Sequence, residues 1–109
     1  MTPAEAIASL DAQLAEHGRD VILRKGHTAT GQVTVRGFVR GAGASKELVG
    51  LLEQGEAMVT ISPTGLGSFG EPADGHVVVF DGRPHALQGD PEFIRLAGVL
   101  VRINMKVKG

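Results

Sequence analysis

The sequence predicts a mainly β fold: a small antiparallel β-barrel or sandwich of about six strands, with an N-terminal α-helix and a long Gly-rich loop. Short segments of alternating apolar and polar residues, separated by turn residues, predict the strands. Glycine accounts for 16 of the 109 residues, about twice its ordinary usage, which indicates many turns. The length predicts a single domain over residues 1–109, with the helix in 1–18 and the barrel in 19–109.

The N-terminal segment carries the sequence signature of a helix start. Thr2 and Glu5 form a capping box around Pro3, which suits the first helical position. Gly18 supplies the end, so the helix is predicted over about residues 3–17. Its apolar stripe, a candidate interface, consists of Ile7, Leu10 and Leu14. This stripe either packs on the barrel of its own chain or docks on another subunit.

The hydrophobic period then changes to two. Residues 20–25 and 32–40 are predicted to pair as a hairpin, and residues 45–55 to contain a short helix. Residues 56–62 are predicted to form a third strand, which Pro63 ends because proline cannot donate to the ladder.

The second half begins with the long loop. Residues 63–75 are predicted to be a structureless connection, a kind of segment that is usually functional or mobile. Asp81-Gly82 predicts a tight hairpin turn between two strands. Residues 89–98 are read as an excursion with one helical turn, and residues 99–108 as the longest strand, with one core face and one largely basic face.

No residue pattern points to catalysis. The chain has no cysteine, and its four histidines lack metal-ligand spacing. Residues 65–70 match G-x-G-x-x-G, but the residues that follow cannot open a helix for a dinucleotide. We therefore expect no enzyme activity, no cofactor and no metal. No stretch is long and apolar enough for a membrane-spanning helix, and we expect no membrane contact.

The basic residues permit two interpretations. A formal charge of −1 gives no general electrostatic signal for nucleic acid. However, outward positions of the strands at 32–40 and 99–108 would form a positive stripe if these strands were neighbours. This candidate basic face consists of Arg36, Arg40, Arg102, Lys106 and Lys108. It is either a solvated sheet face or a surface for a polyanion.

Several segments, in this order and spacing, resemble one family. They are VTVRGFVRG at 33–41, ELV at 47–49, QGE at 54–56, ISPT at 61–64, VVVFDGRP at 77–84, LVRI at 100–103 and VKG at 107–109. Together they are similar to the small head-tail joining proteins of tailed bacteriophages, also called head completion or stopper proteins. The resemblance covers nearly the whole chain.

The resemblance implies a non-catalytic β-barrel subunit that forms a ring in the virion neck, assembled in the bacterial host cytoplasm. Such a ring lies beneath the portal and adaptor, retains packaged DNA and offers a docking surface to the tail. The implied partners are further copies of the chain, the portal or adaptor ring, the tail terminator and, near the channel, DNA bound without sequence specificity.

The resemblance also implies a role for the 63–75 loop, as a channel or subunit-contact segment. Its candidate residues are Leu66, Ser68, Phe69, Glu71 and Asp74. Relatives often carry Trp-Pro and a Lys-Lys pair before the last hairpin, and their absence here favours gating or subunit contact over DNA binding. We further expect the isolated protein to be largely monomeric with this loop mobile.

Two alternative functions remain open at the level of sequence. One is another neck position, tail terminator or adaptor. The other is a small β-barrel nucleic-acid-binding module that uses the basic face.

Overall fold

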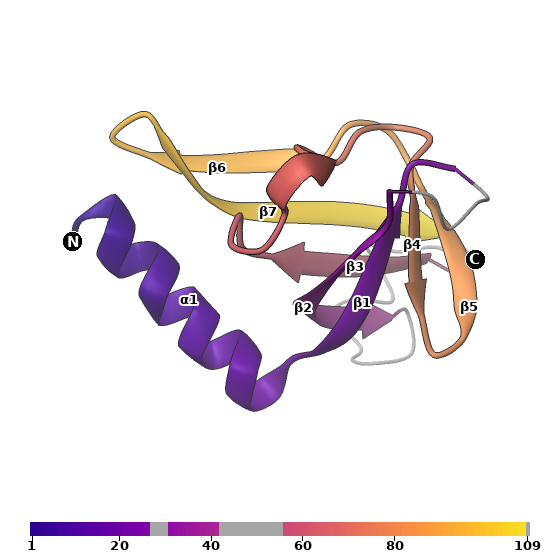
Figure 1. The fold of residues 1–109 in the computed structure, drawn as a ribbon, viewed down its shortest axis with the longest axis horizontal. Coiled ribbons are helices and arrows are strands. Elements are labelled where there is room, and N and C mark those ends of the chain that lie inside the picture. The colour runs from indigo at the N-terminus through magenta and orange to yellow at the C-terminus, as the bar shows by residue number, and fades with distance from the viewer. Residues whose placement is uncertain (27–30, 42–55, 109) are drawn as a thin grey trace.

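One helix and seven strands build the part of the chain that the structure, a computed structural model, describes: residues 1–26, 31–41 and 56–108 (Figure 1). The elements are α1 (Pro3–His17), β1 (Arg19–Arg24), β2 (Val33–Gly41), β3 (Glu56–Ile61), β4 (Val77–Phe80), β5 (Arg83–Leu87), β6 (Glu92–Leu96) and β7 (Val99–Lys108). A short 3-10 turn, η1 (Gly67–Phe69), lies between β3 and β4. The helix predicted within 45–55 lies outside the described residues.

Six of the strands close into an antiparallel barrel. They follow the order β3-β2-β1-β4-β5-β7, and the pairing of β3 with β7 completes the ring of strands. The predicted mainly β, barrel-like fold with an N-terminal helix is therefore confirmed. Closure matters because each of these six strands then has a paired neighbour on both sides.

The seventh strand, β6, extends the barrel on one side. One edge of β7 pairs with β3 through residues 103–108, while its other edge pairs with β6 through residues 99–104 and with β5 at residues 107–108. Residues 99–102 of β7 therefore run past the end of β3. As a result, the tip of the β6–β7 hairpin projects from the barrel beside the N-terminal half of α1 (Figure 1).

Alternating side chains of the strands fill the barrel. Every second residue of β7 from Val101 to Val107 is buried, as are Val59 and Ile61 on β3. The core cluster consists of Val21, Leu23, Val35, Ala57, Val59, Ile61, Leu66, Phe69, Val78, Phe80, Leu87, Ile103, Met105 and Val107. Burial of this apolar surface is the main favourable term in folding.

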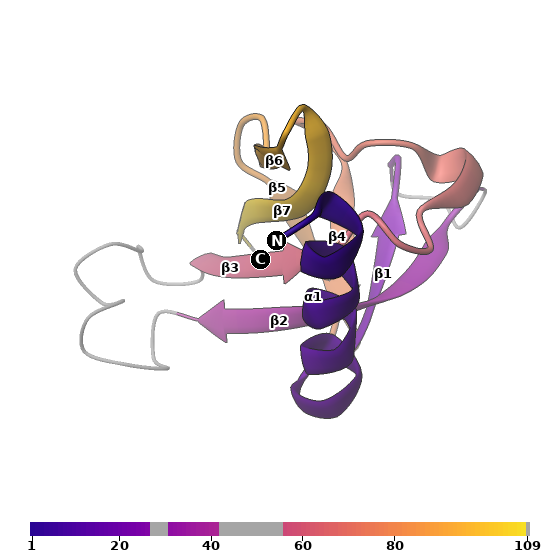
Figure 2. The same ribbon diagram turned by 90° about the vertical axis from the view of Figure 1, so that its left-hand side faces the viewer.

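The helix begins and ends as the sequence predicts. The Thr2 hydroxyl accepts from the Glu5 amide at 3.1 Å, and the Glu5 carboxylate accepts from the Thr2 amide at 3.0 Å. Leu10 and Leu14 are buried where α1 crosses β7 and β2 (Figure 2). Two of the three residues of the predicted apolar stripe thus pack on the barrel of their own chain.

Polar contacts fix α1 at two places. Asp11 accepts hydrogen bonds from the Ser62 hydroxyl and, at 2.7 Å, from the Thr64 hydroxyl. At the C-terminal end, the Arg36 guanidinium donates to the carbonyls of Leu14, Ala15 and Gly18 at 3.2, 3.2 and 2.7 Å. The Leu14 carbonyl also accepts the Gly18 amide at 2.9 Å. A cation at the end of a helix gives its last carbonyls a donor and complements the helix dipole.

The structure corrects the prediction for residues 89–98. They form strand β6 and a tight turn onto β7, with no helical turn. Ala97 and Gly98 have φ values of 52° and 80°, as a two-residue hairpin turn requires. Sequence reasoning missed this turn because alanine rarely adopts positive φ, so Ala-Gly is a weak turn signal. The count of strands rises accordingly from about six to seven in the described residues.

The 63–75 segment is also more ordered than predicted. Leu66 and Phe69 belong to the core, and Pro72 is fully buried. The expectation of a structureless connection is wrong because an apolar side chain recurs about every third residue, and each one fills a position inside the fold.

A glycine in the middle of β2 allows the strands to pack closely. A Cβ on Gly37 would lie 3.1 Å from Ile61 Cγ2 and 3.2 Å from the Thr60 carbonyl oxygen. We expect Gly37→Ala to lower the free energy of unfolding by about 1–3 kcal/mol, because overpacking displaces neighbours. Urea denaturation measures this loss. Gly41→Ala, where a Cβ would meet no described residue within 4 Å, is the control, and equal losses in both variants would contradict the prediction.

A second prediction concerns the attachment of α1. Asp11→Ala removes the acceptor of the buried Ser62 hydroxyl, which should cost about 1–3 kcal/mol. Hydrogen exchange of the α1 amides should accelerate relative to that of β7. The exposed Glu16→Ala is the control, and unchanged α1 exchange in Asp11→Ala would show that these contacts do not hold the helix.

Candidate functional site

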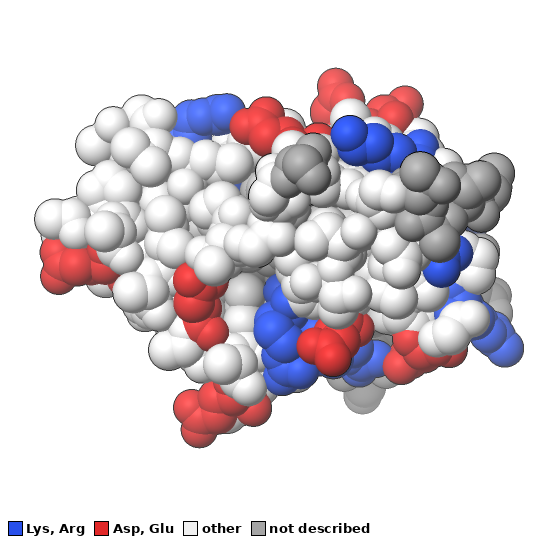
Figure 3. All heavy atoms as spheres, in the orientation of Figure 1, with Lys and Arg blue, Asp and Glu red and all other residues white. Residues whose placement is uncertain are grey.

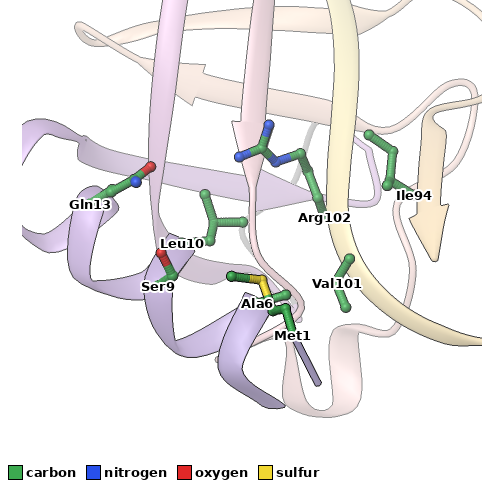
Figure 4. Close-up of a pocket in the computed structure, with 8 residues that line it drawn as sticks. All are labelled: Met1, Ala6, Ser9, Leu10, Gln13, Ile94, Val101 and Arg102. Atoms are coloured by element: carbon green, nitrogen blue, oxygen red, sulfur yellow. The ribbon is translucent and has the colours of Figure 1, made fainter. Parts of the chain in front are cut away.

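An apolar groove lies between the N-terminal half of α1 and the β6–β7 hairpin (Figure 4). Its volume is about 290 Å³, and it is lined by Met1, Ala6, Ser9, Leu10, Gln13, Ile94, Val101 and Arg102. Three large apolar residues remain exposed in the described part of the chain: Met1 at 84% and Ile94 at 37%, which line the groove, and Val99 at 46%, next to the turn of the same hairpin. We call these three residues the apolar patch.

The strand register explains why this patch is exposed. Val99 lies next to the hairpin turn, in the part of β7 that runs past β3, and the register between β6 and β7 shifts between Ile94 and Arg95. Ile94 lies opposite Arg102 on the outer side of the hairpin. The predicted alternation placed Val99 on the core face, and this is wrong because beyond the shift Leu100 packs against the core and Val99 is exposed. Periodicity does not reveal a bulge, which changes the face that a residue occupies.

A second, larger groove crosses the outer face of β2, β3 and β7. Its volume is about 630 Å³, and we call it the polar groove. Half-buried Phe38 and Met58 lie among its polar lining. The complete lining is Gln13, Phe38, Arg40, Met58, Thr60, Gln88, Asp90, Glu92, Arg102, Asn104 and Lys106. Gln13 and Arg102 line both grooves, so the two surfaces adjoin.

The predicted positive stripe does not form, because β3 lies between β2 and β7. Arg36 binds the end of α1 instead, and Lys106 lies 3.4 Å from the buried carboxylate of Glu56. Lys108 pairs with Glu56 in the register of β3 and β7. Of the predicted basic residues, Arg40, Arg102 and Lys106 do meet in the polar groove, together with two acidic residues.

The charges of the polar groove are partly paired. Asn104 donates to Glu92 at 2.8 Å and Thr60 donates to Asn104 at 2.8 Å. In contrast, four groove residues form no ion pair with any residue in the described ranges: Arg40, Arg102, Asp90 and Glu92. The groove therefore offers two guanidinium groups and two carboxylates without an ion-pair partner, beside an apolar floor of Phe38 and Met58.

The candidate residues of the 63–75 loop serve the fold of the chain. Leu66 and Phe69 are buried, and Ser68 lies between them in η1. Glu71 lies 3.7 Å from Arg95 of β6, and Asp74 accepts from the Gly89 amide at 3.0 Å. The loop is thus tied to β6 and to the connection between β5 and β6.

His76 closes this loop. Its Nδ1 accepts the Ala73 amide at 3.0 Å, and its ring contacts Phe69 edge-on with centroids 5.4 Å apart. Burial lowers the pKa of His76 below its ordinary value, and the positive charge of Lys25 lowers this pKa further. An accepting Nδ1 requires the neutral ring, so protonation breaks this hydrogen bond.

The remaining candidate site types find no support in the described residues. No group of three or more His, Cys, Asp or Glu there could hold a metal ion. Within those ranges, no helix has both the length and the apolar character needed to cross a membrane. Comparison of the chain with family models, curated proteins and solved structures finds no match. The two adjoining grooves at α1 are therefore the candidate functional site, and both are surfaces suited to binding.

The His76 geometry predicts a pH-dependent stability. Because the pKa of His76 is lowered on folding, the unfolded chain binds more protons below about pH 6.5. The free energy of unfolding should therefore fall as the pH drops below that value, with a slope of at most about 1.4 kcal/mol per pH unit from this residue. Urea denaturation between pH 7 and pH 5 measures this slope.

The variant His76→Gln should show a shallower slope than the wild type over the same range. His17→Gln, at an exposed position of α1, is the matched control. Identical slopes in the wild type and in His76→Gln would rule out the His76 contribution.

Proposed function

We propose that the chain is a structural subunit of a phage neck, a head-tail joining or stopper protein that assembles into a ring, retains packaged DNA and provides the tail docking surface. The observation that carries this proposal is the apolar patch on a projecting hairpin. Contiguous exposed apolar residues beside a groove are typical of protein-protein contact surfaces. The similarity of the sequence segments to the joining family supplies the particular assembly.

The barrel supports a structural role, in which the subunit acts by holding its contact surfaces in fixed positions. A closed ring of strands gives a rigid body, and α1 is fixed to it through Asp11 and Arg36. Both grooves are therefore bordered by elements that hold their positions. Preorganised surfaces lower the entropic cost of association, which suits a subunit that must form the same contact with each neighbour around a ring.

The nucleic-acid alternative has weaker support. Binding to a phosphate backbone requires clustered cations, whereas the polar groove mixes Arg40, Arg102 and Lys106 with Asp90 and Glu92. We accordingly expect no tight, salt-dependent binding of short DNA or RNA. Binding that weakens steeply with salt, and that Arg102→Ala plus Lys106→Ala abolishes, would favour the alternative.

Deletion of the coding sequence from the parent phage or prophage tests the neck role directly. Electron microscopy should show heads that package DNA, lose it and carry no tails, and supplying the protein in trans should restore tailed particles. Infectious, tailed particles in the absence of the protein would overturn the proposal. An absence of heads would instead indicate an earlier assembly step and would also overturn it.

The apolar patch can be tested in the same complementation. Ile94→Asp plus Val99→Asp places charges on the patch and should abolish the formation of tailed particles, while thermal unfolding confirms that the variant is folded. Thr34→Asp, at an exposed position of β2, is the control and should complement fully. Full complementation by the double variant would show that the patch is not a contact surface.

A further inference from the structure

The polar groove contains charged side chains of both signs that form no ion pair within the described part of the chain. Arg40 and Arg102 have no ion-pair partner there, although both line a concave surface of about 630 Å³. Guanidinium groups that are free in this way favour carboxylate partners, to which they can bind through two parallel hydrogen bonds. The groove is therefore suited to a ligand that presents a carboxylate to Arg40 and Arg102 and keeps it away from Asp90 and Glu92.

The remaining lining indicates which kind of acidic ligand fits. Asp90 and Glu92 would repel a continuous run of phosphates, whereas Phe38 and Met58 offer apolar area at the same place. Mixed charge around an apolar floor is typical of contacts between proteins. A protein surface with a few carboxylates and small or apolar side chains between them meets these requirements.

The outer face of α1, which points away from the barrel, has this composition. Residues 1–18 contain three acidic residues and no Lys or Arg, so they carry a formal charge of −3. The rest of the chain therefore carries +2, which together give the −1 of the whole. Asp11 is bound to Ser62 and Thr64, which leaves Glu5 and Glu16 for the outer face. In Figure 3 acidic side chains follow α1, and basic ones lie at its C-terminal end. The outer face consists of four exposed residues at helical spacing: Glu5, Ala8, Ala12 and Glu16.

A helix of the same chain cannot fill this groove. Leu10 and Leu14 hold the inner face of α1 against the barrel, and Asp11 and Arg36 fix its position. The acidic outer face consequently points away from the barrel that carries the groove. A contact between the two surfaces must therefore join two copies.

We propose that α1 of one copy docks with its outer face in the polar groove of the next copy. The contact pairs the Glu16 carboxylate with the free Arg40 and Arg102 guanidinium groups and places Ala8 and Ala12 over the apolar floor. Because it joins two different surfaces, it is heterologous, and it generates a closed ring when the rotation closes. The inference rests on the proposed ring function in that the partner is a second copy.

Paramagnetic relaxation between copies tests this contact even where association is weak. The chain has no cysteine, so Ala15→Cys, exposed beside the outer face, provides a unique site for a nitroxide spin label that does not fill the contact. Labelled protein is mixed at millimolar concentration with unlabelled, ¹⁵N-enriched protein. The amide signals of Phe38, Met58 and Asn104 should lose most of their intensity, whereas those of β1 and β4 should keep theirs.

Charge reversal provides the controls. Arg40→Glu plus Arg102→Glu in the enriched copy should abolish the broadening, and adding Glu16→Lys to the labelled copy should restore it. A label at Thr34→Cys should leave the groove signals unchanged. Broadening that is absent, that spreads over the whole surface, or that survives the double reversal would overturn the inference.

Titration with a short DNA duplex tests whether the polar groove binds nucleic acid instead of a second copy. Shifts of the same groove amides that disappear on addition of salt would assign the groove to nucleic acid and overturn the inference. If the groove signals are not broadened but the deletion still gives tailless particles that lose their DNA, the proposed contact is wrong and the neck role stands. Broadening together with normal particles on deletion would overturn the neck role and leave the contact standing.

Discussion

The pairing of β3 with β7 is the interaction on which the rest of the structure depends. It runs from Glu56 opposite Lys108 to Ile61 opposite Ile103, and it converts an open sheet into a barrel. The same pairing brings Val59 and Met105 together in the core. On the outer face it sets Met58 beside Lys106 and Thr60 beside Asn104, and these four side chains line the polar groove. The pairing that closes the barrel therefore also forms the polar groove.

The end of this pairing also determines the apolar patch. β3 stops opposite residue 103, whereas β7 and β6 continue to the turn at Ala97 and Gly98. The projecting hairpin then lies beside α1, whose position Asp11 and Arg36 fix. Gln13 and Arg102 belong to both grooves, so a partner that binds one surface approaches the other.

Local chemistry made much of the fold predictable from the sequence. The capping box at Thr2 and Glu5, the turn at Asp81-Gly82 and the alternation along β7 each specify an element through neighbouring residues. Asp81 and Gly82 indeed have φ values of 54° and 73°. The strand at residues 92–96 was not predicted from the sequence. Its turn contains an alanine with positive φ, and alanine is not a turn signal that a sequence pattern reveals.

The candidate site was less predictable because it depends on which strands are neighbours. Arg36 and Arg40 occupy outward positions of one strand, yet one binds the end of α1 and the other lines a groove. Likewise Ile94 and Val99 carry no signal of exposure in their own segments, since the register of the β6–β7 hairpin, with its shift between Ile94 and Arg95, determines which side chains face outward. Leu66 and Phe69 lay in a Gly-rich stretch whose composition concealed their place in the core.

The strand order has a consequence for how the chain folds. The two closing strands are separated in the sequence by β4, β5 and β6. Contacts between segments so distant in sequence require an ordering cost before they yield stability, and they slow folding. During synthesis, β2 and β3 can already pair while β7 is still inside the ribosome. The nascent chain therefore passes through a stage in which one edge of β3 is open to other strands, and pairing with β7 removes this edge.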